Sequence, residues 1–317
     1  MTAIPEKVPT VSLSEPDWDI DAIVAKLRTL RDESLAARRR VGKPVKLPSR
    51  AALVGIIEEL SAALFPNRLG SHVLVGDGVD YFVGHTLNMT LRELVGQVLC
   101  ELRFVAGQEV ASDEQREQAI AIVREFAAAL PGIRALLETD IHAAYDGDPA
   151  ARSVDEVLAC YPGILAITHH RLAHTLHRLG VPLVARIIAE IAHSTTGIDI
   201  HPGAQIKGNF FIDHGTGVVI GETAIIGEHV RLYHGVTLGA KRFQVDETGA
   251  LIKGNARHPI VEDDVVIYAG ATILGRITIG RGSVIGGNVW LTRNVPPGSN
   301  ISQAQVQSEN FSFGSGI

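Results

Sequence analysis

Apolar residues follow two different periods along this 317-residue chain, and the change falls near residue 197. Before that point they recur every three or four residues, which is typical of helices that bury one face. The pattern predicts roughly six to eight helices, over residues 17–40, 51–64, 81–106, 112–130, 163–179 and 181–192. We therefore expect an α-helical N-terminal domain over residues 1–196, with residues 1–16 disordered.

From Gly197 onward an aliphatic or small residue occupies every sixth position. Neither a helix nor an alternating strand sustains this period, whereas short strands that turn at the corners of a coil require it. A generic strand-rich domain is the alternative, but it would have to produce the spacing by chance. The pattern therefore predicts a parallel β-helix over residues 197–298, with roughly four to five coils. The repeat positions are Ile200, Ile206, Ile212, Val218, Ala224, Val230, Val236, Val261, Ile267, Ile273, Ile279, Ile285 and Leu291.

The repeat is interrupted once, between Val236 and Val261. The step between them is 25 residues, one more than four repeats, and the intervening sequence is polar and charged. This predicts a loop ejected from the coil at about residues 240–258, and long loops in compact domains tend to be functional. The pair Pro296-Pro297 is expected to close the coil, and residues 299–317 to form a flexible tail.

Composition and charge narrow the class of protein. The hydrophobic fraction is 46%, the charged fraction 20% and the formal net charge −6, which is ordinary for a soluble globular protein. The chain has no large basic block, which would be expected of a protein that binds nucleic acid or an anionic membrane. No apolar run is long enough to span a bilayer. The two cysteines, Cys100 and Cys160, are too few for a disulfide framework. We expect a cytoplasmic protein without a signal peptide.

Five short motifs stand in the repeat region: DIHP (199–202), DHGTG (213–217), GET (221–223), TLG (237–239) and RHP (257–259). With the acidic segment DIHAAYDGDPAARS (140–153), this combination resembles the bacterial and plant serine acetyltransferases over about residues 135–298. The resemblance implies a left-handed β-helix that assembles as a homotrimer or a dimer of trimers. It also implies acetyl transfer from acetyl-CoA to L-serine, without a metal.

The candidate base is His214. O-acetylation needs a group that takes the hydroxyl proton, and the unperturbed pKa of histidine lies near neutrality. Asp199 lies fifteen residues earlier, close to one coil of about eighteen residues. Stacking of coils would bring its carboxylate near the imidazole, where it would fix the tautomer and support the developing charge. A surface Asp-His pair at a turn is the alternative.

The resemblance assigns further residues to the substrate. Arg257 would bind the serine carboxylate through its planar fork, and His258 would act in catalysis by positioning the reacting end. Asp148 and Asp213 match the acidic pair that holds the ammonium and the hydroxyl, and Glu222 is a further polar position of the site. As alternatives, Arg257 could be a solvated loop residue and Asp148 a helix cap.

The same resemblance places acetyl-CoA along the coil wall, at Gly221, Gly239, Ala240, Lys241 and Arg242. Here the sequence departs from the family: TLGAKRF replaces the usual TLGG, Ala256 replaces an acid, and the usual GVPARIV after the prolines is absent.

Two binding partners are also implied. L-cysteine, an isostere of serine, is expected to inhibit at the same site. The terminal Ile317 is expected to bind O-acetylserine sulfhydrylase, because a terminal carboxylate with an aliphatic side chain can enter a partner's pocket; an ordinary frayed terminus is the alternative.

Three other functions remain open. One is a hexapeptide acyltransferase for an antibiotic or a sugar, and another is a scaffold protein with vestigial catalytic residues. The third is a γ-type carbonic anhydrase, because His229 and His234 are spaced like two of its zinc ligands. His170, His174 and His177 share one helix face and could also hold a metal, although without a carboxylate or cysteine companion we favour packing roles.

Overall fold

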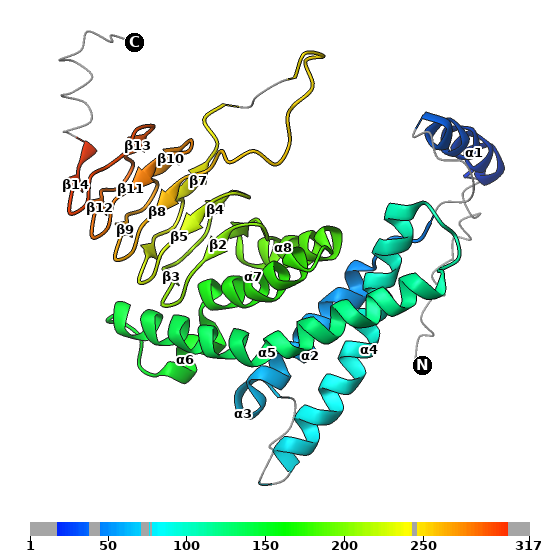
Figure 1. Ribbon diagram of the computed structural model, residues 1–317, viewed down its shortest axis with the longest axis horizontal. Helices are drawn as coiled ribbons and strands as arrows, with labels where there is room; N and C mark the ends of the chain where they lie inside the picture. Colours follow the sequence, from blue (N-terminus) through cyan, green and yellow to red (C-terminus); the bar gives the residue numbers. More distant parts are fainter. Residues whose placement is uncertain (1–17, 38–44, 71–75, 77, 243–245, 304–317) are drawn as a thin grey trace, which may run out of the picture. The chain divides into compact units, whose positions relative to one another are not determined.

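The structure is a computed structural model that describes residues 18–37, 45–70, 76, 78–242 and 246–303. Its contacts divide the chain into two units, Met1–Val45 and Lys46–Ile317. The first unit contains helix α1. The second contains the remaining helices followed by short parallel strands (Figure 1). The helices are α1 (Ile20–Ala37), α2 (Arg50–Leu64), α3 (Pro66–Leu69), α4 (Gly78–Ala106), α5 (Asp113–Gly147), α6 (Val154–Cys160), α7 (Pro162–Arg178) and α8 (Pro182–Thr196).

Helix starts follow the local sequence signals. Ser49 caps α2 by accepting a hydrogen bond from a backbone N–H of its first turn. Ser112 and Gln115 form a complete capping box at the start of α5. Pro162 stands in the first turn of α7, where its missing N–H costs nothing.

Helix α5 is longer than the sequence predicts. The predicted end was Leu130, but the helix continues through Pro131 to Gly147. An internal proline costs about 3 kcal/mol, yet the buried face continues beyond it at Ile133, Leu137 and Ile141. Packing of that face outweighs the lost hydrogen bond, so the expected break at residue 130 was wrong.

The strands form a coil with three sheets, because each coil contributes one strand to each sheet. Sheet A has the order β1-β4-β7-β10-β13, sheet B β11-β8-β5-β2 and sheet C β14-β12-β9-β6-β3, all parallel. The strands are β1 (Asp199–Ile200), β2 (Gln205–Ile206), β3 (Phe211–Ile212), β4 (Val219–Ile220), β5 (Ile225–Ile226), β6 (Arg231–Leu232), β7 (Thr237–Gly239), β8 (Ile260–Val261), β9 (Val266–Ile267), β10 (Thr272–Leu274), β11 (Thr278–Ile279), β12 (Val284–Ile285), β13 (Trp290–Leu291) and β14 (Asn300–Ile301). The chain leaves the coil after β7 and returns at β8, as the interrupted repeat predicts (Figure 1).

The first coil is longer than the later ones. Asp199 pairs with Val219, so this coil holds 20 residues (219 minus 199). Val219 pairs with Thr237, 18 residues on (237 minus 219). The extra residues lie at the corner between sheets C and A, within residues 213–217. Before this corner the six-residue series falls on the second residue of each strand, and from there to β7 on the residue directly before each strand. Both positions are buried, as Ile220 and Val218 show.

The coil also extends past its predicted end. After the proline pair, β14 pairs with β12 in sheet C, with Asn300 opposite Val284 and Ile301 opposite Ile285. The predicted boundary at residue 298 is therefore a corner, and the coil includes at least two further residues. The rest of the predicted tail, residues 304–317 with Ile317, lies outside the described residues, as do residues 1–17.

One hydrophobic cluster joins the helices of the second unit to the coil. Helix α8 ends at Gly197, in the left-handed conformation (φ +70°), and β1 begins two residues later. A buried ion pair reinforces the junction, because Arg171 of α7 donates to both oxygens of Asp140 of α5 over 2.6 and 2.8 Å. Arg171 also donates to the carbonyls of Ile206 and Lys207 in the first coil. Helices α5, α7 and α8 are thus fixed against the coil.

Candidate active site

A strained turn centred on His214 forms the corner between β3 and β4. The φ of His214 is +59°, and the N–H of Gly215 donates to the carbonyl of Asp213 over 2.7 Å. A hydrogen bond across three residues with a positive central φ is the rarer and more strained form of γ-turn. The side chain of His214 is 71% exposed. The imidazole is therefore held on an unusual backbone and open to a substrate.

Two glycines bring helices against β3, directly before this corner. A Cβ on Gly147, the last residue of α5, would lie 2.9 Å from the ring of Phe211. A Cβ on Gly163, in the first turn of α7, would lie 2.3 Å from the carbonyl oxygen of Ile212. Approaches this close require residues without a side chain. The residues next to these glycines are thereby brought to the corner.

Asp148 and Tyr161 are the polar residues delivered in this way. The Tyr161 hydroxyl donates to Asp148 Oδ2 over 2.5 Å, and the N–H of Ala150 donates to Oδ1 over 2.8 Å. These hydrogen bonds, the tyrosine's first, lower the pKa of the Asp148 carboxyl. The same bond raises the pKa of Tyr161 to about 12. At neutral pH the pair is therefore a carboxylate held by a neutral donor.

Asp213 has a cationic partner instead. Arg231 of β6 donates to Asp213 Oδ2 over 3.0 Å. Its guanidinium lies 5.0 Å from the centroid of the Phe211 ring and 4.7 Å from that of Tyr233, so cation–π contacts hold it in place. Asp213 Oδ1 lies 3.8 Å from Nδ1 of His214. We call Asp148, Tyr161, Asp213, His214 and Arg231 the His214 cluster.

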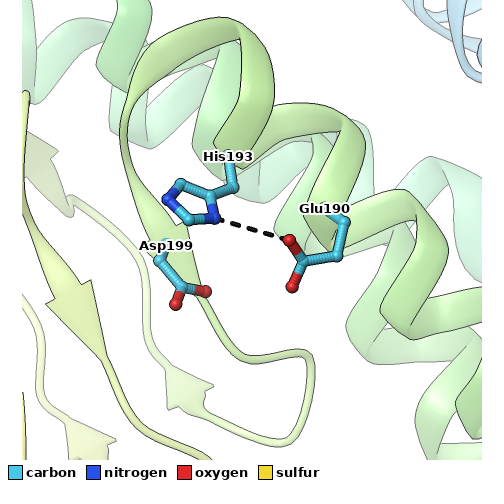
Figure 2. Close-up of side chains that lie close together, drawn as sticks. All are labelled: Glu190, His193 and Asp199. Carbon is cyan, nitrogen blue, oxygen red and sulfur yellow. Dashed lines mark hydrogen bonds and ion pairs between the residues drawn. The ribbon is translucent and has the colours of Figure 1, made fainter.

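Asp199 begins β1 and lies beside helix α8 (Figure 2). Its carboxylate forms a group with Glu190 and His193, in which one atom of each residue lies within 4.8 Å of the others. In sheet A the backbone of Asp199 pairs with Val219 of β4. Within the described residues no hydrogen bond or ion pair joins Asp199 to His214. The Asp199–His214 dyad therefore stays a prediction.

The second group of candidate residues lies at the corner between sheets A and B. Arg257 donates to Glu222 Oε2 over 2.6 Å. The N–H of Thr223 donates to Nδ1 of His258 over 3.0 Å, so in the neutral ring the proton is on Nε2. We call Glu222, Thr223, Arg257 and His258 the His258 cluster.

The environment keeps these groups in defined charge states. Burial, with the nearby Arg257 cation, lowers the pKa of His258 to about 4. Partial burial acts to raise the pKa of Glu222, but the hydrogen bond and charge of Arg257 outweigh it, so that pKa is lowered. At neutral pH the cluster thus presents a neutral imidazole beside a guanidinium–carboxylate pair.

The two clusters lie at opposite ends of strand β4. Residues 213–218 connect β3 of sheet C to β4 of sheet A, whereas residues 221–224 connect β4 to β5 of sheet B. No hydrogen bond or ion pair joins the His214 cluster to the His258 cluster in the part of the chain that the structure describes. One copy of the chain therefore presents the predicted site residues on two separate corners.

A cavity of about 340 Å³ opens beside the His258 cluster. Its lining includes the cations Lys241, Arg242, Arg257 and Arg276, together with apolar side chains such as Ile277. This combination of several cations and an apolar wall fits a ligand that carries phosphates and an alkyl chain.

The other predicted acetyl-CoA contacts have different positions. Gly239 ends β7, and Ala240 follows it directly before Lys241 and Arg242 of the cavity. Gly221 makes room for a side chain, because a Cβ there would lie 2.0 Å from Cδ2 of His258. The need for glycine at position 221 is thus explained by packing against His258.

Three candidate functional residues were not predicted from the sequence. Tyr161 and Arg231 carry no motif, and only the three-dimensional arrangement shows their contacts with the acidic pair. Thr223 had a signal, since it stands in the GET motif. Its hydroxyl accepts hydrogen bonds from the backbone N–H groups of both Arg257 and His258, over 2.9 and 3.2 Å.

Most of the candidate metal-binding histidines lie beside other groups, whereas the buried Nδ1 of His170 has no hydrogen-bond partner among the described residues. Nδ1 of His174 lies 2.8 Å from the carbonyl oxygen of Pro202, and the rings of His170 and His174 are 5.5 Å apart. His229 pairs with Asp264, whereas His234 lies at the next corner with its ring 5.9 Å from that of His214. Across the described residues, the group that could hold an ion is Glu190, His193 and Asp199, and Glu190 is also paired with Arg186. A zinc site of three histidines is not found in this part of the chain.

No helix in the described part of the chain is both long enough and apolar enough to cross a bilayer.

Known proteins share both the sequence and the fold. The family described as "Bacterial transferase hexapeptide (six repeats)" matches residues 258–293. The plasmid-encoded serine acetyltransferase of Synechococcus elongatus is 57% identical over 304 residues, which is 95% of each chain.

Two solved structures have related folds. One is serine acetyltransferase 1 of Entamoeba histolytica in complex with L-cysteine, with a TM-score of 0.67 at 37% identity, covering 83% of this chain and 90% of that one. The other is the Neisseria gonorrhoeae serine acetyltransferase in complex with serine, with a TM-score of 0.51 at 28% identity, covering 79% of this chain and 94% of that one. The 57% identity to the Synechococcus elongatus relative over 95% of each chain, together with the hexapeptide match and the shared fold, shows that this chain belongs to the serine acetyltransferase family and carries a left-handed β-helix of hexapeptide repeats.

Proposed function

We propose that this chain transfers the acetyl group of acetyl-CoA to the hydroxyl of L-serine, with His214 as the general base. The observation that carries the proposal is the His214 turn. It presents an exposed imidazole beside two carboxylates, at the corner where α5 and α7 reach the coil. The names of the relatives support the reaction and the acceptor.

The proposed chemistry is a direct acyl transfer. Serine binds with its ammonium at Asp148 and Asp213 and its carboxylate at Arg257, with Glu222 holding the guanidinium in place. His214 takes the hydroxyl proton as the serine oxygen attacks the thioester carbonyl. The tetrahedral intermediate then collapses, the C–S bond breaks, and the CoA sulfur leaves with a proton returned by the imidazolium. Asp199 is proposed to support the charge on that ring.

Acetyl-CoA is proposed to bind in the cationic cavity. Lys241, Arg242 and Arg276 would receive the phosphates, and the apolar wall would contact the pantetheine chain. From there the chain of the cofactor can run along the coil past Gly239 and Ala240. The thioester would then lie near His258, whose Nε2–H can donate to an acyl oxygen.

The active site is proposed to form between subunits of a homotrimer. Each copy presents the His214 cluster and the His258 cluster at opposite ends of β4, and no hydrogen bond or ion pair joins them within the described residues. In a cyclic trimer, the first corner of one subunit can face the second corner of its neighbour. We further propose that two trimers pair, with the N-terminal helices forming the contact between them.

Two regulatory partners complete the proposal. L-cysteine has the same ammonium and carboxylate as serine and would compete for the same groups; the Entamoeba histolytica relative was solved with L-cysteine. The terminal Ile317, which lies outside the described residues, is proposed to bind O-acetylserine sulfhydrylase.

The test is CoA release from acetyl-CoA with L-serine, homoserine, threonine or no acceptor. We expect serine-dependent release, and a fall in kcat of roughly 10²- to 10⁴-fold in His214→Ala. His229→Ala is the matched control, because that histidine is also exposed but lies at another corner. Asp199→Asn should lower kcat while the KM for serine stays nearly unchanged. Release with none of these acceptors from folded protein would reject the serine assignment and favour another acyl acceptor.

A further inference from the structure

Asp148 and Asp213 lie at the same corner but have partners of different charge. Asp213 is paired with the Arg231 guanidinium, which cancels its charge locally. Asp148 receives its side-chain hydrogen bond from Tyr161, a neutral group. A substrate ammonium is attracted by negative charge, and Asp148 is the carboxylate of the two without a directly bonded cation.

The backbone around Tyr161 is rigid. Its N–H donates to the carbonyl of Val157 over 3.1 Å and ends α6, while its own carbonyl accepts from the N–H of Ile164 over 3.1 Å and starts α7. Pro162 follows and restricts the conformation of the residue before it. Gly163 then fixes the start of α7 against the coil. The backbone that carries the phenol is therefore fixed relative to the His214 turn.

The carboxylate of Asp148, in contrast, ends a helix and would rotate freely on its own. Two hydrogen bonds prevent this, one to each oxygen, from Ala150 and Tyr161. A carboxylate oxygen has about two acceptor positions, so each oxygen of Asp148 keeps one for a substrate donor. The arrangement fixes the direction of the carboxylate and leaves its charge and free lone pairs in place.

We infer that Tyr161 is a positioning residue for the acceptor: its hydroxyl holds the Asp148 carboxylate in the orientation that receives the substrate ammonium. The inference rests on the proposed function, since it assumes an amino-acid acceptor. It predicts that Tyr161 contributes to the binding of acceptors with an α-ammonium group and contributes nothing to acceptors without one.

The test is Tyr161→Phe, which removes the hydroxyl and keeps the ring. We expect the KM for L-serine to rise about tenfold, the size expected for a hydrogen bond to a charged group. The kcat and the KM for acetyl-CoA should stay within about twofold. The inhibition constant of 3-hydroxypropanoate, which is serine without its amino group, should not change. Tyr268→Phe is the matched control, because that tyrosine lies at the same corner and stacks on Tyr233 without touching Asp148.

A double-mutant cycle separates positioning from a general structural effect. In the Asp148→Asn background, Tyr161→Phe should add less than twofold to the KM for serine, because its target has lost its charge. Full additivity of the two changes would overturn the inference, as would an unchanged KM for serine in the single variant or an equal weakening of 3-hydroxypropanoate. A wild-type enzyme that does not use serine would instead overturn the proposed function, and this inference with it.

Discussion

At the scale of single residues, the site depends on side chains held in defined charge states. His214 is exposed on a γ-turn with positive φ, whereas His258 is buried with Nδ1 bound to a backbone N–H. Burial disfavours the charged form of an imidazole, so His258 stays neutral at neutral pH. These environments agree with the roles proposed above: proton transfer for the exposed His214, and hydrogen-bond donation through Nε2–H for the buried His258.

The low pKa of His258 predicts a loss of stability in acid. Its pKa is about 4 in the folded protein and 6.5 for a free imidazole. Between these values the unfolded chain binds a proton that the folded chain does not, so the free energy of unfolding falls as the pH drops from 6.5 to 4. After allowance for solvent screening, we expect this residue to contribute a loss of about 1–2 kcal/mol.

His258→Asn is the variant that tests this, because its amide oxygen can replace Nδ1 as acceptor but does not titrate. Denaturant unfolding at pH 7 and at pH 4 would be compared for both proteins. The variant should lose less stability than the wild type over this range. An equal loss in the two proteins would show that other groups, such as His201 with its own pKa of about 4, account for the acid sensitivity.

At the scale of secondary-structure elements, two glycines decide where the helices meet the coil. Gly147 and Gly163 permit α5 and α7 to touch β3, and this places Asp148 and Tyr161 at the His214 turn. Neither glycine interrupts a helix from within, since one ends α5 and the other lies in the first turn of α7. Their role is close approach and not chain reversal.

Gly163→Ala should therefore disturb both stability and substrate binding. The new Cβ would lie 2.3 Å from the Ile212 carbonyl oxygen, so α7 must shift away from the coil. We expect a loss of about 1–3 kcal/mol in the free energy of unfolding and a higher KM for serine. Gly132→Ala in α5 is the control, since a Cβ there meets nothing within 4 Å. Wild-type stability and KM in Gly163→Ala would contradict the packing argument.

Most of the secondary-structure elements could be predicted from the sequence, and the exceptions have physical causes. The six-residue repeat, the ejected loop and most helices follow from apolar spacing and caps. The passage of α5 through Pro131 could not be predicted, because it depends on tertiary packing of the face that includes Ile133. The 20-residue first coil was missed because the series moves from one buried position to another without losing its period. In this longer coil Asp199 pairs with Val219 of β4.

At the scale of the whole molecule, residue motifs identified the chemistry but not its placement. The sequence places DHGTG and GET only a few residues apart, yet the coil puts them on corners at opposite ends of β4. This separation cannot be predicted from the local sequence, because it arises from the turning of the chain between three sheets. The contact of Arg231 with Asp213 could not be predicted either, because Arg231 lies in the next coil.

We expect the His214 cluster of one subunit and the His258 cluster of another to form one serine acetyltransferase site. The most direct test mixes two variants, His214→Ala and Arg257→Ala, each affecting one corner. They would be co-expressed in equal amounts with different tags, and serine-dependent CoA release would be measured at low serine concentration. Every mixed cyclic trimer should regain one intact site, which gives about a quarter of the wild-type activity per subunit. Activity no greater than the average of the separate variants would contradict the claim and place the site within a single chain.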